Sequence, residues 1–425
     1  MRRWSVRSAV GLAAVALLAA ACGSSGSSSS STKPPTSSTS SAAAATGGSS
    51  GNAIVVGGLQ DGNFAGIDTG FKARIARFNS QGGVGGRTIK FIGVLNDGNN
   101  LSTDLSNAQT LVLKDHVFAV APVGSQVLNP SSTQLFAQNS TPYVGWGISP
   151  TFCSNNWGFP IVGCEASATW QNTSGYTQAA QAIGKSPKGL RVAVIGTDNA
   201  GGKAGTQGII ASIKKAGANV VYGQAPVPQA GSTDYTPYVQ ALLATNPDLI
   251  QLVVNFISAT GLTAALRQAG YKGALWNPTA YLPGLLAAQP QLAQALTGSL
   301  VVANFPPAED GSAAARQVQA DLKAMGAPTN FGLGEAVGWW SAEELIQELQ
   351  ATAAKGPVTQ ANFEKVINAG WTISPLAGGI KDLNFPKNHI NAPGCYGTLM
   401  AQGSKYVDKV PYTCTPSASI NVTGG

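Results

Sequence analysis

The stretch that decides the fold class is residues 67–100, IDTGFKARIARFNSQGGVGGRTIKFIGVLNDGNN. Apolar residues recur in its first half at the spacing of one helix face: Ile67, Phe71, Ile75 and Phe78. Gly82 and Gly83 then end the helix. Residues 88–95 predict a strand, and residues 54–56 predict another strand before the helix. Strand, helix and strand in this order predict a β-α-β unit with parallel strands.

The same alternation continues along the chain. Strands are predicted at residues 54–56, 88–95, 117–121, 142–145, 190–195, 219–222, 249–254, 274–276 and 299–303. Later helices are predicted at residues 313–325, 336–354 and 359–368. The last 50 residues are loop-rich, with short strands expected at 380–384 and 396–401. Nearly continuous apolar strands between helices predict an α/β protein with doubly wound parallel sheets.

The amino-terminal segment predicts export. Three Arg residues precede an apolar run at residues 9–21, which is shorter than the roughly 20 residues that span a bilayer. We therefore expect an export signal at residues 1–21. The sequence LAAAC at its end resembles a bacterial lipobox, in which Cys22 is lipidated, although Ala19 stands where Leu is usual. The alternative is an ordinary A-x-A cleavage site, which also cuts before Cys22.

Residues 22–52 are predicted to be a lipidated Cys22 followed by a disordered tether. After the cysteine this segment is almost entirely Ser, Thr, Gly, Ala and Pro, and Lys33 is its only charge. Such a sequence cannot bury enough apolar surface to offset the entropy of ordering. We expect a tether with a reach of roughly 30 Å, held by its lipid at the outer face of the cytoplasmic membrane.

The remaining body, about 370 residues long, exceeds the usual size of one core, so two domains are expected. The signal holds three of the 26 Lys and Arg residues and none of the 19 Asp and Glu residues, which leaves a net charge of +4. This charge, without long basic runs, argues against nucleic acid as a partner. No later run approaches 18 apolar residues, so no second membrane segment is expected.

Four cysteines follow Cys22, at positions 153, 164, 395 and 414. An exported protein meets an oxidising environment, so two disulfides are expected. Four cysteines allow three connectivities. We favour Cys153–Cys164 with Cys395–Cys414, because each pair brackets a loop rich in Gly, Pro and Asn. A metal site and a cofactor are not expected, since the chain has no CxxC motif and only two histidines.

The loops that follow the predicted strands form the candidate binding site. They lie at residues 59–66, 96–100, 122–127, 145–149, 197–204, 254–258 and 277–282. In open parallel sheets, ligands bind beyond the carboxyl ends of the strands. These loops are rich in Gly, Asn, Ser and Thr and contain the aromatic residues Phe64, Trp146, Phe256 and Tyr281. Apolar walls with a few directed polar groups are typical of small-molecule clefts.

The order of these motifs resembles the type I periplasmic-binding-protein family, in particular the branched-chain amino-acid receptors of ABC importers. The matching segments are FNSQGGVGGRTIKFIGVLNDGNN, FAVAPVGSQV and TPYVGWGISP, followed by RVAVIGTDNAGGKAG. The resemblance implies two doubly wound lobes joined by a three-crossover hinge. It places lobe one at residues 53–171 plus 304–372 and lobe two at residues 172–303 plus 373–425.

The resemblance also implies how a ligand would be held. Amino-acid receptors of this family hold the ligand carboxylate with a Ser after the third strand, which Ser125 matches, and with a Thr after the fourth strand. The Thr position falls on Ile148 or Ser149. The acidic residue that holds the ligand ammonium aligns near Thr279, where no carboxylate stands. A buried ammonium without a counter-charge is costly, so an ordinary α-amino acid is disfavoured unless another loop supplies the charge.

The predicted ligand-binding residues are Phe64, Ser125, Trp146, Gly147, Ser149, Asn255, Phe256, Thr279 and Tyr281. Each has a structural alternative. Ser125 would equally cap a helix that follows Gln126, and Trp146 would pack under the next loop. Phe256 and Tyr281 would belong to the hinge-side core, and the polar residues at strand ends would form turns.

An enzyme is not expected, because neither histidine lies in a predicted cleft loop and no G-x-S-x-G or H-E-x-x-H motif occurs from residue 53 on. The leading hypothesis is a monomeric, exported, lipid-anchored receptor that binds a small molecule and delivers it to an ABC permease. The alternative is a lipoprotein that senses its ligand and signals to a membrane partner without transport.

Overall fold

The computed structural model describes residues 53–165 and 173–414. The predicted export signal at residues 1–21, the lipidated Cys22 and the tether lie outside the described residues. Every described residue belongs to one compact unit, Thr46–Gly425. Among the described residues, no helix is long and apolar enough to cross a membrane.

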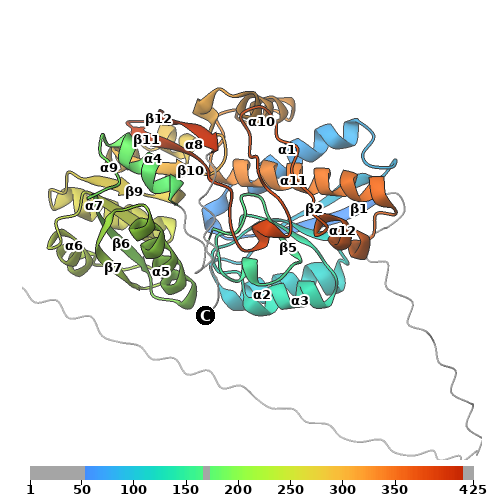
Figure 1. Cartoon of the computed structure of the whole chain (residues 1–425), viewed down its shortest axis with the longest axis horizontal. Coiled ribbons are helices and arrows are strands. Elements are labelled where there is room, and N and C mark those ends of the chain that lie inside the picture. Colours follow the sequence, from blue (N-terminus) through green and yellow to red (C-terminus); the bar gives the residue numbers. More distant parts are fainter. Residues whose placement is uncertain (1–52, 166–172, 415–425) are drawn as a thin grey trace, which may run out of the picture. The chain divides into compact units, whose positions relative to one another are not determined.

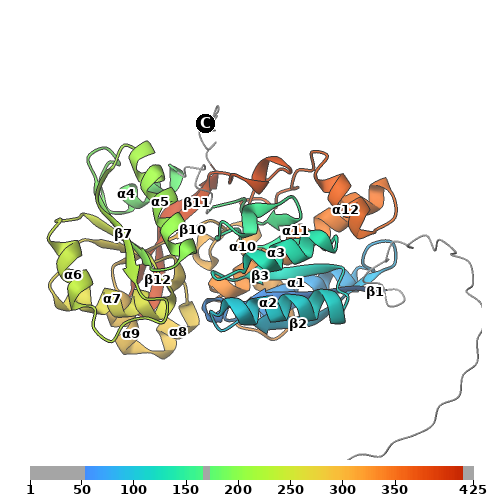
Figure 2. The same cartoon turned by 90° about the horizontal axis from the view of Figure 1, so that it is seen from below.

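A five-stranded parallel sheet forms the centre of the first lobe. Its strands are β1 (Ala53–Gln60), β2 (Thr88–Asn96), β3 (Ala119–Gly124), β4 (Tyr143–Gly145) and β5 (Gly158–Pro160). Their spatial order is β2-β1-β3-β4-β5, and each neighbouring pair is parallel. The helices of this lobe are α1 (Ile67–Ser80), α2 (Leu101–Gln109), α3 (Pro130–Gln138), α10 (Ala313–Ala324), α11 (Leu333–Lys355) and α12 (Gln360–Ile367). Helices α2 and α3 cover one face of the sheet, and α1, α10 and α11 cover the other (Figures 1 and 2).

A seven-stranded sheet forms the centre of the second lobe. Its strands are β6 (Arg191–Thr197), β7 (Asn219–Val227), β8 (Leu249–Val253), β9 (Ala274–Trp276), β10 (Ser299–Ala303), β11 (Cys395–Gln402) and β12 (Lys405–Cys414). Their order is β12-β11-β10-β9-β8-β6-β7. The longer helices are α4 (Ser174–Ala182), α5 (Ala200–Lys215), α6 (Thr236–Leu243) and α7 (Phe256–Gln268), followed by the short α8 (Pro283–Ala288) and α9 (Pro290–Leu296). Helices α4 and α5 pack on one face of this sheet, and α6 and α7 pack on the other.

Short helical turns connect several of these elements. Single 3₁₀ turns lie at Gly62–Phe64, Phe152–Ser154, Pro278–Ala280, Ala308–Asp310 and Lys387–His389, and a π-helical turn at Thr110–Lys114 extends α2. The chain passes between the two sheets three times: after β5, after β10 and after α12. Two α/β lobes with largely parallel sheets and helices on both faces confirm the predicted fold class.

The carboxyl-terminal part differs from the sequence prediction. Strand β11 pairs antiparallel with β10, and β12, which the sequence did not predict, pairs antiparallel with β11. The segment 380–384 is not a strand, although Asn384 forms an isolated bridge with Thr372. The long β11–β12 hairpin therefore extends one edge of an otherwise parallel sheet.

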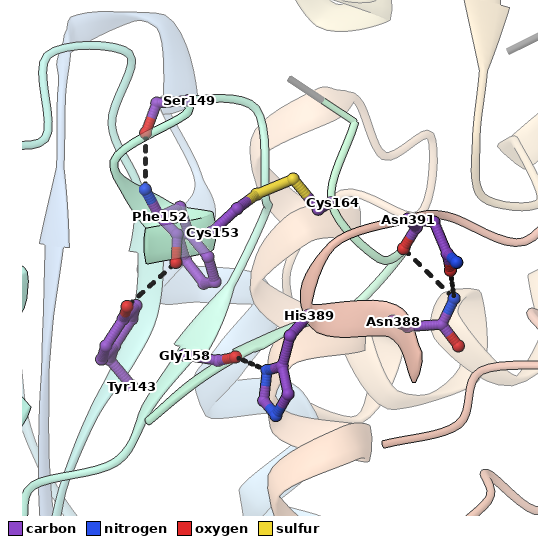
Figure 3. Close-up of a disulfide and its surroundings, with 9 residues drawn as sticks. All are labelled: Tyr143, Ser149, Phe152, Cys153, Gly158, Cys164, Asn388, His389 and Asn391. Atoms are coloured by element: carbon purple, nitrogen blue, oxygen red, sulfur yellow. Dashed lines mark hydrogen bonds between the residues drawn. A yellow bond between two sulfur atoms is a disulfide. The ribbon is translucent and has the colours of Figure 1, made fainter. Parts of the chain in front are cut away.

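The two disulfides have the favoured sequence-local pairing. Cys153 bonds Cys164, and Cys395 bonds Cys414. The second disulfide joins directly paired positions of the β11–β12 hairpin. The first ties the turn after β4 to the segment that leaves the first lobe (Figure 3). That segment is also held by backbone hydrogen bonds from the Cys164 amide to the carbonyls of Asn388 and Asn391.

Helices α1 and α11 approach each other closely because glycines face each other's backbone. A Cβ atom added at Gly70 would lie 1.9 Å from the carbonyl oxygen of Glu335, and one added at Gly338 would lie 1.9 Å from that of Ile67. Only a residue without a side chain fits at such a distance. This contact fixes α11 against the first sheet and brings its buried face, which includes Trp339 and Trp340, into the core.

Candidate functional site

A cavity of about 230 Å³ lies beyond the carboxyl ends of the strands and is lined by residues from both lobes. The first lobe and the segment after it contribute Asn99, Gln126, Val127, Trp146, Ile148 and Glu165. The second lobe contributes most of the remaining wall, including Tyr176, Thr197, Asn199, Gln229, Gln251, Asn255, Trp276 and Thr279. One side of the cavity is completed by Val302 from β10, Asn304 from the segment after β10, and Tyr396 from β11. The position agrees with the rule for open α/β sheets.

Several polar residues of the wall are held in place as helix caps. The Asn199 side chain accepts a hydrogen bond from the Gly202 amide at 2.6 Å and caps α5. The Asn255 side chain accepts one from the Ser258 amide at 2.9 Å, caps α7 and donates to the Gln229 carbonyl oxygen at 2.9 Å. Cap residues at strand-to-helix junctions are fixed by the local backbone. These two amides are therefore both structural caps and parts of the cavity wall.

Hydrogen bonds also join the two lobes near the cavity. The Gln229 side chain donates to the Asn99 carbonyl oxygen at 2.9 Å. The backbone amide of Phe256 donates to the Asn63 side-chain oxygen at 3.0 Å. Loops at the carboxyl ends of the two sheets thus contact each other directly beside the cavity.

Glu165 is the acidic residue of the cavity wall. Its Oε2 accepts hydrogen bonds from the indole N–H of Trp146 at 3.0 Å and from the Asn304 amide at 2.5 Å. Its Oε1 accepts a hydrogen bond from the Tyr396 hydroxyl at 3.0 Å. Burial raises the pKa of Glu165, and the three hydrogen bonds act in the opposite direction. The carboxylate is therefore held by donors from three separate segments of the chain.

Aromatic side chains form much of the rest of the wall. The rings of Tyr176 and Trp276 meet edge to face with centroids 5.1 Å apart. Trp146 meets Phe64 in the same way at 5.6 Å, so Phe64 supports the wall from behind. Two buried polar atoms of wall residues, the indole nitrogen of Trp276 and the side-chain oxygen of Asn304, have no hydrogen-bond partner among the described residues. Such atoms are expected where a ligand completes the hydrogen bonding.

Beneath the first-lobe side of the cavity lies a group of buried carboxylates. The Ser125 hydroxyl donates to Asp97 at 2.6 Å, and Asp61 accepts hydrogen bonds from the amides of Asn63 and Gln126 at 2.7 and 2.8 Å. Burial raises the pKa of Asp97 to about 7, and the charge of Asp61 contributes to this shift. Burial also raises the pKa of Asp61. The Ser125 hydroxyl is thus already used within the protein.

Of the nine residues predicted to bind ligand, Trp146, Asn255 and Thr279 line the cavity. The Thr279 hydroxyl donates to the Asn277 side chain at 2.9 Å. Ser125 lies behind the wall, next to the lining residues Gln126 and Val127. It does not cap α3, as the structural alternative proposed, because that helix begins at Pro130 and Asn129 is its cap.

The other five predicted residues are not part of the cavity wall. Phe64 and Tyr281 are fully buried, and Tyr281 donates its hydroxyl hydrogen to Glu309 at 2.6 Å. Ser149 accepts a hydrogen bond from the Phe152 amide at 3.1 Å (Figure 3). The Gly147 carbonyl oxygen accepts a hydrogen bond from the Glu165 amide at 2.9 Å. Phe256 begins α7 beside the wall residue Asn255.

Sequence reasoning missed Glu165, Asn304 and Tyr396. The predicted site residues lie in loops that follow predicted strands, whereas Glu165 and Asn304 lie where the chain passes between the lobes. Tyr396 lies in β11, whose antiparallel pairing was not foreseen. A lone Glu directly after a disulfide cysteine was the only local signal. Among the described residues, no group of three or more His, Cys, Asp and Glu is arranged to hold a metal ion.

Comparison with known proteins places the chain among solute-binding proteins. The sequence model of the family described as periplasmic binding protein matches residues 51–396. None of the curated proteins compared with the chain matches it.

Solved structures with the same fold bind chemically different solutes. One is a fatty acid ABC transporter substrate-binding protein from Thermomonospora curvata, with a TM-score of 0.72 and 18% identity, where the match covers 87% of this chain and 94% of that chain. Another is an ABC transporter solute-binding protein from R. palustris in complex with 4-hydroxybenzoate, with a TM-score of 0.67, 19% identity and coverage of 86% and 98%. A third is described as a possible leucine/isoleucine/valine-binding protein from Rhodopirellula baltica SH 1, with a TM-score of 0.67, 15% identity and coverage of 84% and 96%. At these identities the likeness shows the fold alone.

Proposed function

Because the chain belongs to the periplasmic binding protein family, we propose that it is the extracytoplasmic solute receptor of an ABC importer. In this proposal a small molecule is trapped between lobe one, residues 53–171 plus 304–372, and lobe two, residues 172–303 plus 373–425. The protein acts as a monomer, is held by lipidated Cys22 at the outer face of the cytoplasmic membrane and delivers its ligand to permease subunits.

The observation that carries this proposal is a cavity whose wall combines residues of both lobes. Trp146 stands on the first-lobe side and Trp276 on the second-lobe side. A ligand that contacts both sides stabilises the closed arrangement of the lobes over the open one, by an amount equal to its difference in affinity for the two. The permease would then recognise the closed form.

The ligand we propose is not an ordinary α-amino acid. Two of the groups with which amino-acid receptors of the family hold their ligand are changed or occupied. Ser125 donates its hydroxyl hydrogen to Asp97, and Thr279 stands where the acidic residue would be and donates to Asn277. The usual contacts to an α-carboxylate and an α-ammonium are therefore not offered at these positions.

Thermal unfolding of residues 53–425 against a panel of amino acids, aromatic acids, amines, polyols and sugars tests the function. A ligand at 100 times its Kd adds about 2.7 kcal/mol to the free energy of unfolding. For lobes of this size the midpoint should rise by roughly 5–10 °C. Trp146→Ala should abolish the rise, whereas the control Trp157→Ala, in a tryptophan of the same lobe outside the cavity wall, should keep it.

Import is tested separately in the source cells. Removal of the protein should abolish uptake of the compound that shifts the midpoint, and a Cys22→Ala form should fail to restore uptake at normal expression. If uptake continues without the protein while binding is intact, the importer role is wrong and the receptor serves another membrane partner.

A further inference from the structure

We propose that the ligand is an organic cation, with an ammonium group on an apolar or aromatic body, and that Glu165 is its counter-charge. The inference rests on the proposed function, because it requires a small molecule in the cavity described above. It identifies the chemical class of that molecule and moves the ammonium-binding residue from the position of Thr279 to the segment between the lobes.

Glu165 has no cationic partner among residues 53–165 and 173–414. The ion pairs among the described residues use other acids, namely Asp68, Asp198, Asp248, Asp321 and Glu343. None of the residues that line the cavity is Lys, Arg or His. The segment 166–172, ASATWQN, which follows Glu165 directly, also contains no basic residue. The positive charge that would balance this carboxylate is therefore left to a ligand.

Burial raises the pKa of Glu165, and its hydrogen bonds oppose that rise because they favour the ionised form. The indole of Trp146 can only donate, and the Asn304 group that faces Glu165 is its NH₂. With the Tyr396 hydroxyl, three donors reach the two carboxylate oxygens. Donors of this kind stabilise a carboxylate over the neutral acid. A carboxylate has about four lone-pair positions, so acceptor capacity remains for a ligand N–H.

The walls around Glu165 suit a cation with an apolar body. Trp146, Tyr176, Trp276 and Tyr396 all line the cavity, and aromatic faces attract an ammonium group electrostatically. The Asn304 side-chain oxygen, in a residue that is only 5% exposed, is a further acceptor without a partner among the described residues. The unpartnered indole N–H of Trp276 would donate to a hydroxyl or carbonyl oxygen elsewhere on the ligand.

The other charge classes fit this wall less well. An anionic ligand such as a benzoate would share the cavity with Glu165 and would find no basic side chain among the lining residues. A neutral ligand would cover Glu165 without balancing it, and a buried charge left without a partner is costly. A positively charged group on the ligand would pair with the carboxylate of Glu165 and remove the imbalance.

Two sets of matched probes test the charge of the ligand. The first set keeps an aromatic body: 2-phenylethylamine is cationic, 2-phenylethanol is neutral and phenylacetate is anionic. The second set keeps a branched body: choline is cationic and 3,3-dimethyl-1-butanol is its neutral isostere. Thermal unfolding of residues 53–425 at neutral pH should show a midpoint increase for the cationic members that exceeds the increase for their neutral and anionic counterparts.

Variants connect this preference to Glu165. Glu165→Gln should weaken binding of the cationic probe about 10- to 100-fold, the range expected when a hydrogen bond to a charged group is lost. Glu165→Asp keeps the carboxylate and should keep the preference for cations. If Glu165→Asp binds the cation and Glu165→Gln does not, the loss in the Gln variant is due to the missing charge. The control Glu364→Gln changes an acid that does not line the cavity and should bind like the wild type. Equal binding by Glu165→Gln, or a larger shift with phenylacetate or 2-phenylethanol, overturns the proposal.

If none of the probes raises the unfolding midpoint, the ligand that is bound in the cells provides the test. The protein is purified from its own cells without unfolding, denatured, and the released small molecule is analysed by mass spectrometry and electrophoresis. A molecule that is cationic at neutral pH supports the proposal. A neutral or anionic molecule overturns it but leaves the receptor function standing. Release of no molecule, together with silent probes, counts against the receptor function and the inference that depends on it.

Discussion

Glu165 and the pair Glu344–Glu348 are acids without a cationic partner in the described part of the chain, but their surroundings differ. Glu165 lines a cavity and accepts three hydrogen bonds. Glu344 and Glu348 lie one turn apart on α11, are 1% and 0% exposed, and have four carboxyl oxygens without a hydrogen-bond partner among the described residues. Burial raises the pKa of both well above the usual value, and the charge of Glu348 adds to the shift of Glu344.

Burial raises the pKa of all three acids, but only at Glu165 do hydrogen-bond donors among the described residues oppose that rise. A buried carboxyl group without hydrogen-bond donors has a lower free energy as the neutral acid, because burial of an unpaired charge is unfavourable. Three hydrogen-bond donors stabilise the carboxylate form of Glu165, which can then pair with a positive charge. The pair on α11 is therefore part of the core of lobe one, whereas Glu165 is part of the site.

Glu343, next to the pair on α11, provides the third case, because its counter-charge is built into the protein. It accepts a hydrogen bond from Arg74, and both residues are buried, at 5% and 6% exposed. The guanidinium also lies 6.0 Å from the ring centroid of Trp339. Three neighbouring acids on one helix thus include two without a hydrogen-bond partner among the described residues and one that is paired with Arg74.

The largest effect should come from removal of the built-in cation. Arg74→Met would leave the buried carboxyl group of Glu343 without its ion-pair partner, which should lower the free energy of unfolding by about 3–5 kcal/mol. Urea unfolding measures this loss. In the control Lys72→Met, the exposed pair Lys72–Asp68 is removed, and the loss should stay below about 1 kcal/mol. Equal losses in the two variants would mean that burial of Glu343 does not make its charge dependent on Arg74.

The next effect should appear in the pH dependence of stability. Because the pKa of Glu344 and Glu348 is raised in the folded protein, the folded state retains protons that the unfolded state loses above the usual value of 4.5. Stability contributed by these groups is present below that pH and is lost as the pH rises, by about 1.4 kcal/mol per pH unit for each retained proton. Glu348→Gln should therefore become more stable relative to the wild type as the pH rises from 5 to 8, by at most about 4 kcal/mol for one proton retained over these three pH units.

Urea unfolding at several values between pH 5 and pH 8 gives this comparison. Glu165→Gln serves as the matched control, because the carboxylate of Glu165 already has donors in the folded state and should show a smaller change. Parallel stability profiles for wild type and Glu348→Gln would show that the pair on α11 is ionised in the fold, and the contrast with Glu165 would fail.

Much of the fold could be predicted from local patterns. The helical spacing of Ile67 and Phe71 and the apolar run at residues 88–95 reappear as α1 and β2. Strand β12 could not be predicted in this way, because its sequence, KYVDKVPYTC, has no regular alternation of polar and apolar residues and contains a proline. Its place depends on antiparallel pairing with β11, which the local sequence does not reveal, although the disulfide Cys395–Cys414 that joins the two strands was expected.

The site was predictable only where it follows the strand-end rule. Trp146, Asn255 and Thr279 come directly after strands, and they line the cavity. Glu165 is hydrogen-bonded to Asn304, which lies 139 positions further along the chain, and to Tyr396, which lies 231 positions further along. No periodicity or spacing connects such residues, because only the return of the chain between the lobes brings them together.

A smaller effect should follow from removal of one donor to Glu165. Tyr396→Phe deletes the hydroxyl that reaches Oε1, so the pKa of Glu165 should rise and binding of 2-phenylethylamine should weaken about five-fold, or about 1 kcal/mol. Isothermal titration calorimetry measures the change. The control Tyr271→Phe removes a hydroxyl that donates to the Ala274 carbonyl oxygen and does not line the cavity. Unchanged affinity in Tyr396→Phe would mean that this donor does not prepare Glu165 for a cation.

The smallest effect is measured in the unmodified sequence, as the pKa of each of the three acids. In protein labelled with ¹³C at the glutamate carboxyl carbons, Glu165 should titrate at a lower pH than Glu344 and Glu348, because only Glu165 has donors that stabilise its ionised form. The Gln variants at each position assign the signals. Addition of 2-phenylethylamine should lower the apparent pKa of Glu165 and leave the pair on α11 unmoved, since a nearby cation favours the carboxylate. If Glu165 titrates together with the pair, or does not respond to the amine, the distinction between a neutral core acid and a charged site acid is wrong.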